Sequence, residues 1–271
     1  RISTCFLLKI SWIFEVLSTL GACPLQKPLT KNKLKKLGII TALPAEAKCF
    51  QAKKINFKSP IEIERNIFLC ISGIGYKSSL YAANELIKLN VDALISWGIA
   101  GATCDLVNTG DLILAKAVKR HKNIYKTSNE WCKKIIYHFQ GSSLKILNED
   151  IVSTEEICST PVKKMNLFKK TKASVVDMES AAMAEVAMTN NLDFIIVRAI
   201  ADNAILNIPD VVIKNIDNYG RIKIIKLMTS CMFRPSQINQ IFLLAKSYKK
   251  ALKSLEIFSI ELKKENFFYL T

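Results

Sequence analysis

The stretch Val175–Ala204, VVDMESAAMAEVAMTNNLDFIIVRAIADNA, decides the fold that we expect for this chain. After a buried strand end and an acidic turn, Met178–Ala187 is apolar almost all round, which predicts a helix packed inside a domain. Asn190 and Asn191 favour the end of that helix, because asparagine tolerates the left-handed conformation. The near-continuous apolar run Phe194–Ile200 then predicts a parallel strand covered on both faces.

Two carboxylates of this stretch, Glu179 and Asp202, fall where the predicted elements end. Ligands of open α/β sheets bind at the carboxyl ends of strands, so both residues are candidates for a site. The alternative is that Glu179 is a helix-terminus charge and Asp202 an exposed loop acid. Spacing alone leaves both interpretations open.

A third carboxylate occupies a comparable place near the start of the chain. Leu37–Leu43 (LGIITAL) predicts a first buried strand, and Pro44 is typical of the first turn of a helix, here running to about Lys53. Glu46 therefore lies in a first turn just beyond a strand end. The helix dipole favours a carboxylate there whether or not it reaches a ligand.

The remaining elements alternate between strands and helices, which predicts an α/β domain with a mainly parallel or mixed sheet. Small residues at Gly98–Ala102 follow a predicted strand and would let a ligand lie against the backbone. In chain order we expect a strand or hairpin at Ile61–Ile71, a helix at Tyr76–Leu89, strands at Val91–Trp97 and Leu112–Val118, a helix with Trp131, a strand at Leu144–Leu147, a loop at Ile151–Thr154 and a polar helix leading to Val175.

Composition narrows the function classes. With 271 residues, half of them apolar, the chain can form one large domain. The net charge of +16 suggests an anionic partner, but no zinc-finger, RNA-recognition or arginine-rich signature accompanies the scattered lysines, so nucleic acid is not expected. Eight cysteines without a C-x-x-C pair, and only two histidines, indicate reduced thiols in a cytosolic protein and no metal centre.

The two ends of the chain are interpreted separately. We expect Arg1–Lys36 to be an extension outside the fold and residues 37–271 to form a single domain. The C-terminal part predicts an amphipathic helix, which either docks on the sheet with solvated lysines or lies beside an anionic membrane. One face of that helix carries Leu244, Tyr248, Ala251 and Leu255, and the opposite face Lys246, Lys249, Lys250 and Lys253.

Together these motifs resemble the purine nucleoside phosphorylase / 5′-methylthioadenosine–S-adenosylhomocysteine nucleosidase superfamily. The motifs GIITALPAE, SGIG, WGIAGA, GD, DMES and RAIAD occur between Leu37 and Ala204 in the order and approximate spacing of that family. TALPAEA, SWGIAGA, VDMES and the tail from Tyr219 are similar to the hopanoid-associated branch, the adenosylhopane nucleosidases. The resemblance implies a three-layer αβα domain with a mixed central sheet, a homo-oligomer, no cofactor and a cytoplasmic enzyme.

The same resemblance implies roles for particular residues in cleaving a purine–ribose N-glycosidic bond. Asp202 matches the acid that protonates the purine, and Glu46 matches the carboxylate that activates the attacking water. Glu179 matches the residue that holds the ribose hydroxyls. Further substrate contacts are expected from Met178 against the sugar, from Ile99, Ala100 and Gly101, and from Val152 and Ser153 near the purine.

The attacking group is either water or phosphate, and the residues favour water. A phosphate pocket needs cationic and hydroxyl donors, whereas the two relevant loops offer Glu46 and Ile99. Lys48 and Lys77 keep phosphorolysis open. Three hypotheses follow: an adenine-releasing nucleosidase, with adenosylhopane at a membrane surface as one candidate substrate; a phosphorylase of the same fold; or a catalytically idle nucleoside-binding module at the membrane.

Overall fold

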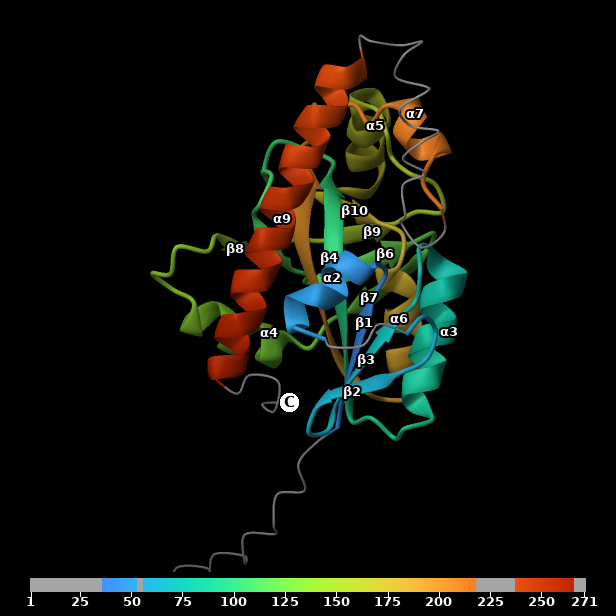
Figure 1. The fold of residues 1–271 in the computed structure, drawn as a ribbon, viewed down its shortest axis with the longest axis vertical. Coiled ribbons are helices and arrows are strands. Elements are labelled where there is room, and N and C mark those ends of the chain that lie inside the picture. Colours follow the sequence, from blue (N-terminus) through green and yellow to red (C-terminus); the bar gives the residue numbers. More distant parts are fainter. Residues whose placement is uncertain (1–35, 53–55, 218–236, 266–271) are drawn as a thin grey trace, which may run out of the picture. The chain divides into compact units, whose positions relative to one another are not determined.

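Two long parallel strands, β4 (Ala93–Ala102) and β11 (Asp193–Asp202), form the centre of the fold (Figure 1). The computed structural model describes residues 36–52, 56–217 and 237–265. Both strands are almost entirely buried, because their apolar runs are covered on both faces. The predicted strand at 194–200 is thus confirmed and extends by a residue or two at each end.

The sheet is mixed, as the resemblance implied. β1 (Leu37–Thr41) runs parallel to β4 and β3 (Ile67–Ile71), and β2 (Ile61–Glu64) pairs antiparallel with β3. The C-terminal end of β4 pairs antiparallel with β10 (Val175–Asp177). Beyond β10 come β9 (Ile151–Ser153), β6 (Ala117–Arg120) and β7 (Asn123–Lys126), and on the free side of β11 come β5 (Leu112–Leu114) and β8 (Ile146–Leu147).

Two helices cover one face of this sheet. α3 (Tyr76–Ile87) and α6 (Ser180–Thr189) pack against each other and present mainly alanines to the strands. Small side chains allow a close approach between helix and sheet, which explains why α6 is apolar almost all round. The helix ends as predicted, with Asn190 as its C-cap and Asn191 at a φ of 53°.

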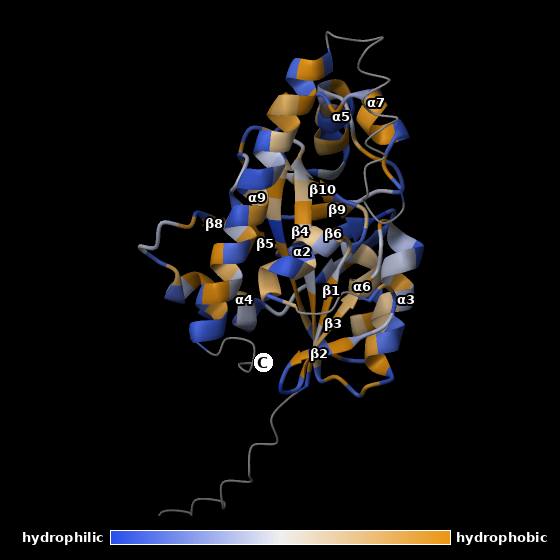
Figure 2. Cartoon of the chain, viewed as in Figure 1, coloured by the Kyte–Doolittle hydropathy of each residue, from blue (hydrophilic) through white to orange (hydrophobic). Residues whose placement is uncertain are grey.

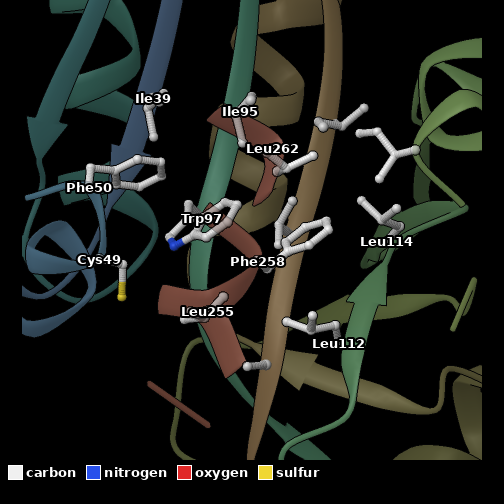
Figure 3. Packing of buried hydrophobic residues seen from close by; sticks show 14 of the residues in the cluster. Ile39, Cys49, Phe50, Ile95, Trp97, Leu112, Leu114, Leu255, Phe258 and Leu262 are labelled. Carbon is white, nitrogen blue, oxygen red and sulfur yellow. The ribbon is translucent and has the colours of Figure 1, made fainter. Parts of the chain in front are cut away.

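The opposite face is covered by α9 (Ile238–Lys264), α4 (Asn129–His138), the short α2 (Pro44–Ala47) and the 3₁₀ turn η1 (Lys48–Phe50). The centre of this layer is aromatic (Figure 3). Trp97 of β4 stacks on Phe258 of α9, with ring centroids 5.7 Å apart, and contacts Phe50 at 4.8 Å. Helices on both faces make the unit a three-layer domain.

Several predicted elements need correction. The helix expected from Pro44 to about Lys53 is the short α2 followed by η1, which ends at Phe50. The expected loop at 151–154 is instead strand β9, because its backbone is paired between β6 and β10. The expected strand at 112–118 is two strands, since β5 pairs with β11 while β6 pairs with β9. The glycines at 98 and 101 lie inside β4, because β11 pairs with it along this whole length.

The C-terminal helix follows its predicted faces. Ala251 and Leu255 are buried, whereas the four lysines of the opposite face are exposed. Hydrophilic and hydrophobic residues alternate along α9 (Figure 2). No helix among the described residues is both long and apolar enough to span a membrane. The prediction for residues 1–35 lies outside the described residues. The fold is completed by α5 (Pro161–Thr171) and α7 (Asp210–Lys214).

Candidate active site

Glu46 is buried just beyond the end of β1, held by three backbone N–H groups. Its Oε2 atom accepts hydrogen bonds from the amides of Ala42 and Leu43, both at 2.9 Å, and Oε1 accepts one from Ile99 at 3.0 Å. A carboxylate has about four acceptor positions, so one remains for a further ligand. Burial raises the pKa of Glu46, while the hydrogen bonds from Ile99 and Leu43 act in the opposite direction.

Glu179 occupies the N-cap position of α6. Its Oε1 atom accepts from the amide of Gly75 at 2.8 Å, and Oε2 accepts from Met178 at 3.2 Å. Gly75 has a φ of 95°, a conformation that favours glycine, so the SGIG motif serves to bring this amide to Glu179. Burial and the neighbouring Asp177 raise the pKa of Glu179 to about 7.

Glu46 and Glu179 line the same small cavity, which lies beside the middle of β4. Gly98 makes this possible, because a Cβ atom there would lie 2.7 Å from Oε1 of Glu46. The cavity is walled by Ile40, Ala42, Ser96, Trp97, Gly98, Ile99 and Arg198. Two of the three predicted carboxylates are therefore brought together around one space.

Arg198 is a site residue that the sequence analysis did not single out. It is buried, and its Nε atom donates to Asp177 Oδ2 at 3.0 Å. Its Nη2 atom donates to the hydroxyls of Ser96 and Ser180, at 2.7 and 2.8 Å. An arginine inside an otherwise apolar strand was the available signal, because a buried guanidinium requires acceptors.

Asp202 ends β11 beside Gly101 of β4. Only 8% of its surface is exposed, so of the two interpretations left open by the sequence, that of an exposed loop acid is wrong. A Cβ atom on Gly101 would lie 3.0 Å from both carboxylate oxygens, which shows how closely the carboxylate approaches the backbone. Asp202 does not line the small cavity, and its neighbour Gly101 follows the cavity residue Gly98 by three positions along β4, a rise of roughly 10 Å between their Cα atoms.

Asp202 is paired with a second residue that the sequence analysis missed, Lys164 of α5. The Lys164 ammonium donates to Asp202 Oδ2 at 2.5 Å. Burial raises the pKa of Asp202, and the ammonium acts against that rise. The signal in the sequence was helical spacing, since Lys164 precedes Leu167 and Phe168 by three and four residues and so shares their half-buried face.

The other predicted contact residues are placed differently. Ile99 reaches the cavity, and its amide binds Glu46. Ala100 and Val152 are buried in apolar clusters. The hydroxyl of Ser153 donates to Asp177 at 2.5 Å and accepts from the amide of Ala181, so it supports the network around Arg198. Met178 is half-buried next to Glu179.

This geometry defines a class of protein: a three-layer α/β domain with buried carboxylates near the C-terminal ends of its central strands. The chain belongs to the phosphorylase superfamily, whose family model matches residues 36–219. This match covers the sheet, Glu46, Glu179 and Asp202, and leaves α9 outside.

Individual relatives are more distant. A 5′-methylthioadenosine/S-adenosylhomocysteine nucleosidase of Staphylococcus aureus is 24% identical over 208 residues, covering 70% of this chain and 87% of that protein. The structure of the corresponding Helicobacter pylori nucleosidase, in complex with a substituted pyrrolidin-3-ol, aligns with a TM-score of 0.60 at 19% identity, covering 84% of this chain and 99% of that one. A futalosine hydrolase from the same organism aligns with a TM-score of 0.59, at the same identity and coverages.

Proposed function

We propose that this protein hydrolyses the N-glycosidic bond of an adenine nucleoside that carries a 5′-substituent. The observation that carries the proposal is the placement of three buried carboxylates beside the C-terminal half of β4, two on the cavity that Gly98 lines and the third against Gly101. The relatives named as nucleosidases, and the one named as a hydrolase, support the same reaction class.

The roles follow from the chemistry of the bond. Asp202 donates a proton to the purine, so that a neutral base leaves with the electron pair of the broken bond. Glu46 uses its remaining acceptor position to orient and deprotonate water. Glu179 accepts hydrogen bonds from the ribose hydroxyls, and the clustered carboxylates stabilise the positive charge that develops on the sugar. Met178 packs near the sugar in this arrangement.

The charges around the cavity favour water over phosphate as the group that attacks the sugar. A phosphate dianion needs free cationic donors. Arg198 directs its guanidinium to Asp177, Ser96 and Ser180, so it is largely committed to the protein. Lys48 and Lys77, the two lysines that kept phosphorolysis open, are both exposed and do not line the cavity.

The 5′-substituent is proposed to be a lipid such as the hopane of adenosylhopane. Support comes from α9, where the exposed side chains of Phe242 and Leu243 lie close to Lys246, Lys249 and Lys250. Apolar and basic side chains together on one helix suit the surface of an anionic membrane. The enzyme would then work at the cytoplasmic membrane surface. We also propose that it is a homo-oligomer.

The test is adenine release from methylthioadenosine, adenosylhomocysteine and detergent-solubilised adenosylhopane, each with and without phosphate. Phosphate-independent release supports hydrolysis, and restriction to the lipid substrate supports the hopanoid assignment. Formation of ribose-1-phosphate derivatives that requires phosphate would overturn hydrolysis in favour of a phosphorylase. Binding without release from any substrate would instead support an idle nucleoside-binding module.

The pH dependence should reflect Glu179. The ribose hydroxyls bind best to an ionised carboxylate, and burial raises the pKa of Glu179 to about 7. Below that pH the carboxyl is protonated, so KM should rise about tenfold per pH unit as pH falls, while KM above it is constant. Steady-state kinetics of the wild type and of Glu179→Gln provide the measurement. A wild-type KM that stays constant from acid to alkaline pH would contradict this role.

Gly98→Ala should disable Glu46 without changing a carboxylate. The new Cβ would lie 2.7 Å from Oε1 and 2.9 Å from Cδ of Glu46, so the buried carboxylate must move. A displacement of about 1 Å at a reacting group costs on the order of 100-fold in turnover. The control is Gly141→Ala, which strains the backbone because Gly141 has a φ of 84°, but which places no atom within 4 Å of the new Cβ and does not touch the cavity. Equal turnover of both variants would contradict a role of Glu46 in the reaction.

A further inference from the structure

Lys164 is the one residue of α5 whose side chain is fully buried within the described structure. Its neighbours on the helix, Lys163 and Met165, are exposed. Burying an ammonium group is unfavourable unless it is paired and hydrogen-bonded. Because α5 buries a lysine while its apolar side chains are more exposed, we expect the ammonium group to interact with a specific partner in the interior.

The ammonium group of Lys164 is completely satisfied. It donates to Asp202 Oδ2 at 2.5 Å, to the backbone oxygen of Asn203 at 2.6 Å and to that of Leu206 at 3.0 Å. An ammonium has three donors, and all three are used. Lys164 therefore fixes one oxygen of Asp202 and anchors the turn that follows β11. Among the described residues, no side chain donates a hydrogen bond to the other oxygen of Asp202.

We infer that Lys164 is a positioning residue that controls the proton of Asp202 during cleavage of the glycosidic bond. This inference rests on the proposed function. In the step, the protonated Asp202 gives its proton from the oxygen not bound by Lys164 to the purine, and the electron pair of the C1′–N9 bond moves to the purine ring. The carboxylate left behind then faces the Lys164 ammonium, which neutralises it.

The other groups near Asp202 do not supply this charge. Cys158, just before α5, is the second titratable side chain that interacts with Asp202, and burial raises the pKa of its thiol, so it stays neutral. The charge of Lys163 lowers the pKa of the Cys158 thiol, but the Lys163 side chain is exposed to solvent. Among the described residues, Lys164 is the cation that forms an ion pair with Asp202.

The structure predicts the sign of the effect on pH dependence. Lys164 opposes the rise that burial causes in the pKa of Asp202. Without the ammonium that pKa rises further, because the opposite charge that favours the ionised carboxylate is lost. Asp202 would then remain protonated to higher pH, but would be a weaker acid and less firmly oriented. The alkaline limb of the activity profile should move upward while the maximal rate falls.

The experiment compares Lys164→Met and Lys164→Gln with Lys163→Met, which removes the same charge from the exposed side of α5. With an adenine nucleoside, both Lys164 variants should lose about 100-fold in kcat and show the shifted alkaline limb. The Lys163 variant should match the wild type in both respects. A thermal unfolding curve for each variant shows that it is folded, and the Gln variant provides a second polar test if the Met variant is unstable.

A second substrate separates this role from a merely structural one. 4-Nitrophenyl riboside has a leaving group that departs as a stable anion and needs no proton. If Lys164 acts through the proton of Asp202, its variants should cleave this substrate at nearly the wild-type rate. Equal losses on both substrates, or an unshifted alkaline limb, would overturn the inference. A wild type that cleaves neither substrate would refute the proposed function instead.

Discussion

Asp202→Asn is expected to lower kcat for adenine nucleosides by about 10²- to 10⁴-fold, the usual contribution of a general acid. The amide has nearly the same shape as the carboxyl group but cannot give up a proton to the purine. Nucleoside binding should remain measurable, because Glu179 and the cavity are untouched. Adenine release measures turnover, and equilibrium dialysis with a labelled nucleoside measures binding.

The control for this variant lies on the same strand. Asp193 starts β11 at its opposite, exposed end, so Asp193→Asn removes the same charge far from the site. Asp202→Asn also leaves Lys164 buried without a counter-charge, which should lower stability, and combining it with Lys164→Met should restore much of that loss. Unchanged turnover in the Asp202 variant would remove Asp202 from the mechanism.

Arg198→Met is expected to lower the free energy of unfolding by about 3–5 kcal/mol, the range for breaking one side of a buried ion pair. Both Arg198 and Asp177 are almost completely buried, and the variant leaves the Asp177 carboxylate without its cation. Urea unfolding followed by circular dichroism measures the change. Turnover should fall as well, because Ser180 and Glu179 adjoin the same network.

An exposed ion pair provides the comparison. Lys263 and Glu64 lie 3.1 Å apart with both side chains partly in solvent, so Lys263→Met should cost about 0–1 kcal/mol. In the double variant Arg198→Met with Asp177→Asn, no unpaired charge remains, and part of the lost stability should return. If Arg198→Met unfolds at the wild-type urea concentration, the buried pair does not contribute to stability as described.

Much of the fold was predictable because its signals are local. The apolar runs of β1, β4 and β11 predict buried strands by composition alone, and the asparagines after α6 predict its end through their backbone preference. The predictions failed where pairing decided the outcome. Residues 151–153 form a strand because β6 and β10 lie on either side, and the split between β5 and β6 arises because they pair with different neighbours.

The candidate site was predictable to a similar degree. Glu46, Glu179 and Asp202 were found because each follows an element whose end can be recognised in the sequence. Arg198 and Lys164 were not found, since their importance comes from partners 21 and 38 residues away in sequence. Lys163 and Lys164 are identical in type and adjacent, and their difference depends on which one α5 turns toward β11.

The sequence by itself therefore determined the class of fold and the family, and it singled out the three carboxylates as candidates, because these depend on hydrophobic patterning and on motifs within single elements. Only the tertiary structure decided the environment of those carboxylates. It buried Asp202, for which the sequence left a buried site and an exposed loop open, and paired it with Lys164. It also brought the amide of Ile99 to Glu46 and that of Gly75 to Glu179. The physical reason is that burial and charge pairing, which govern proton affinity, depend on contacts between distant segments.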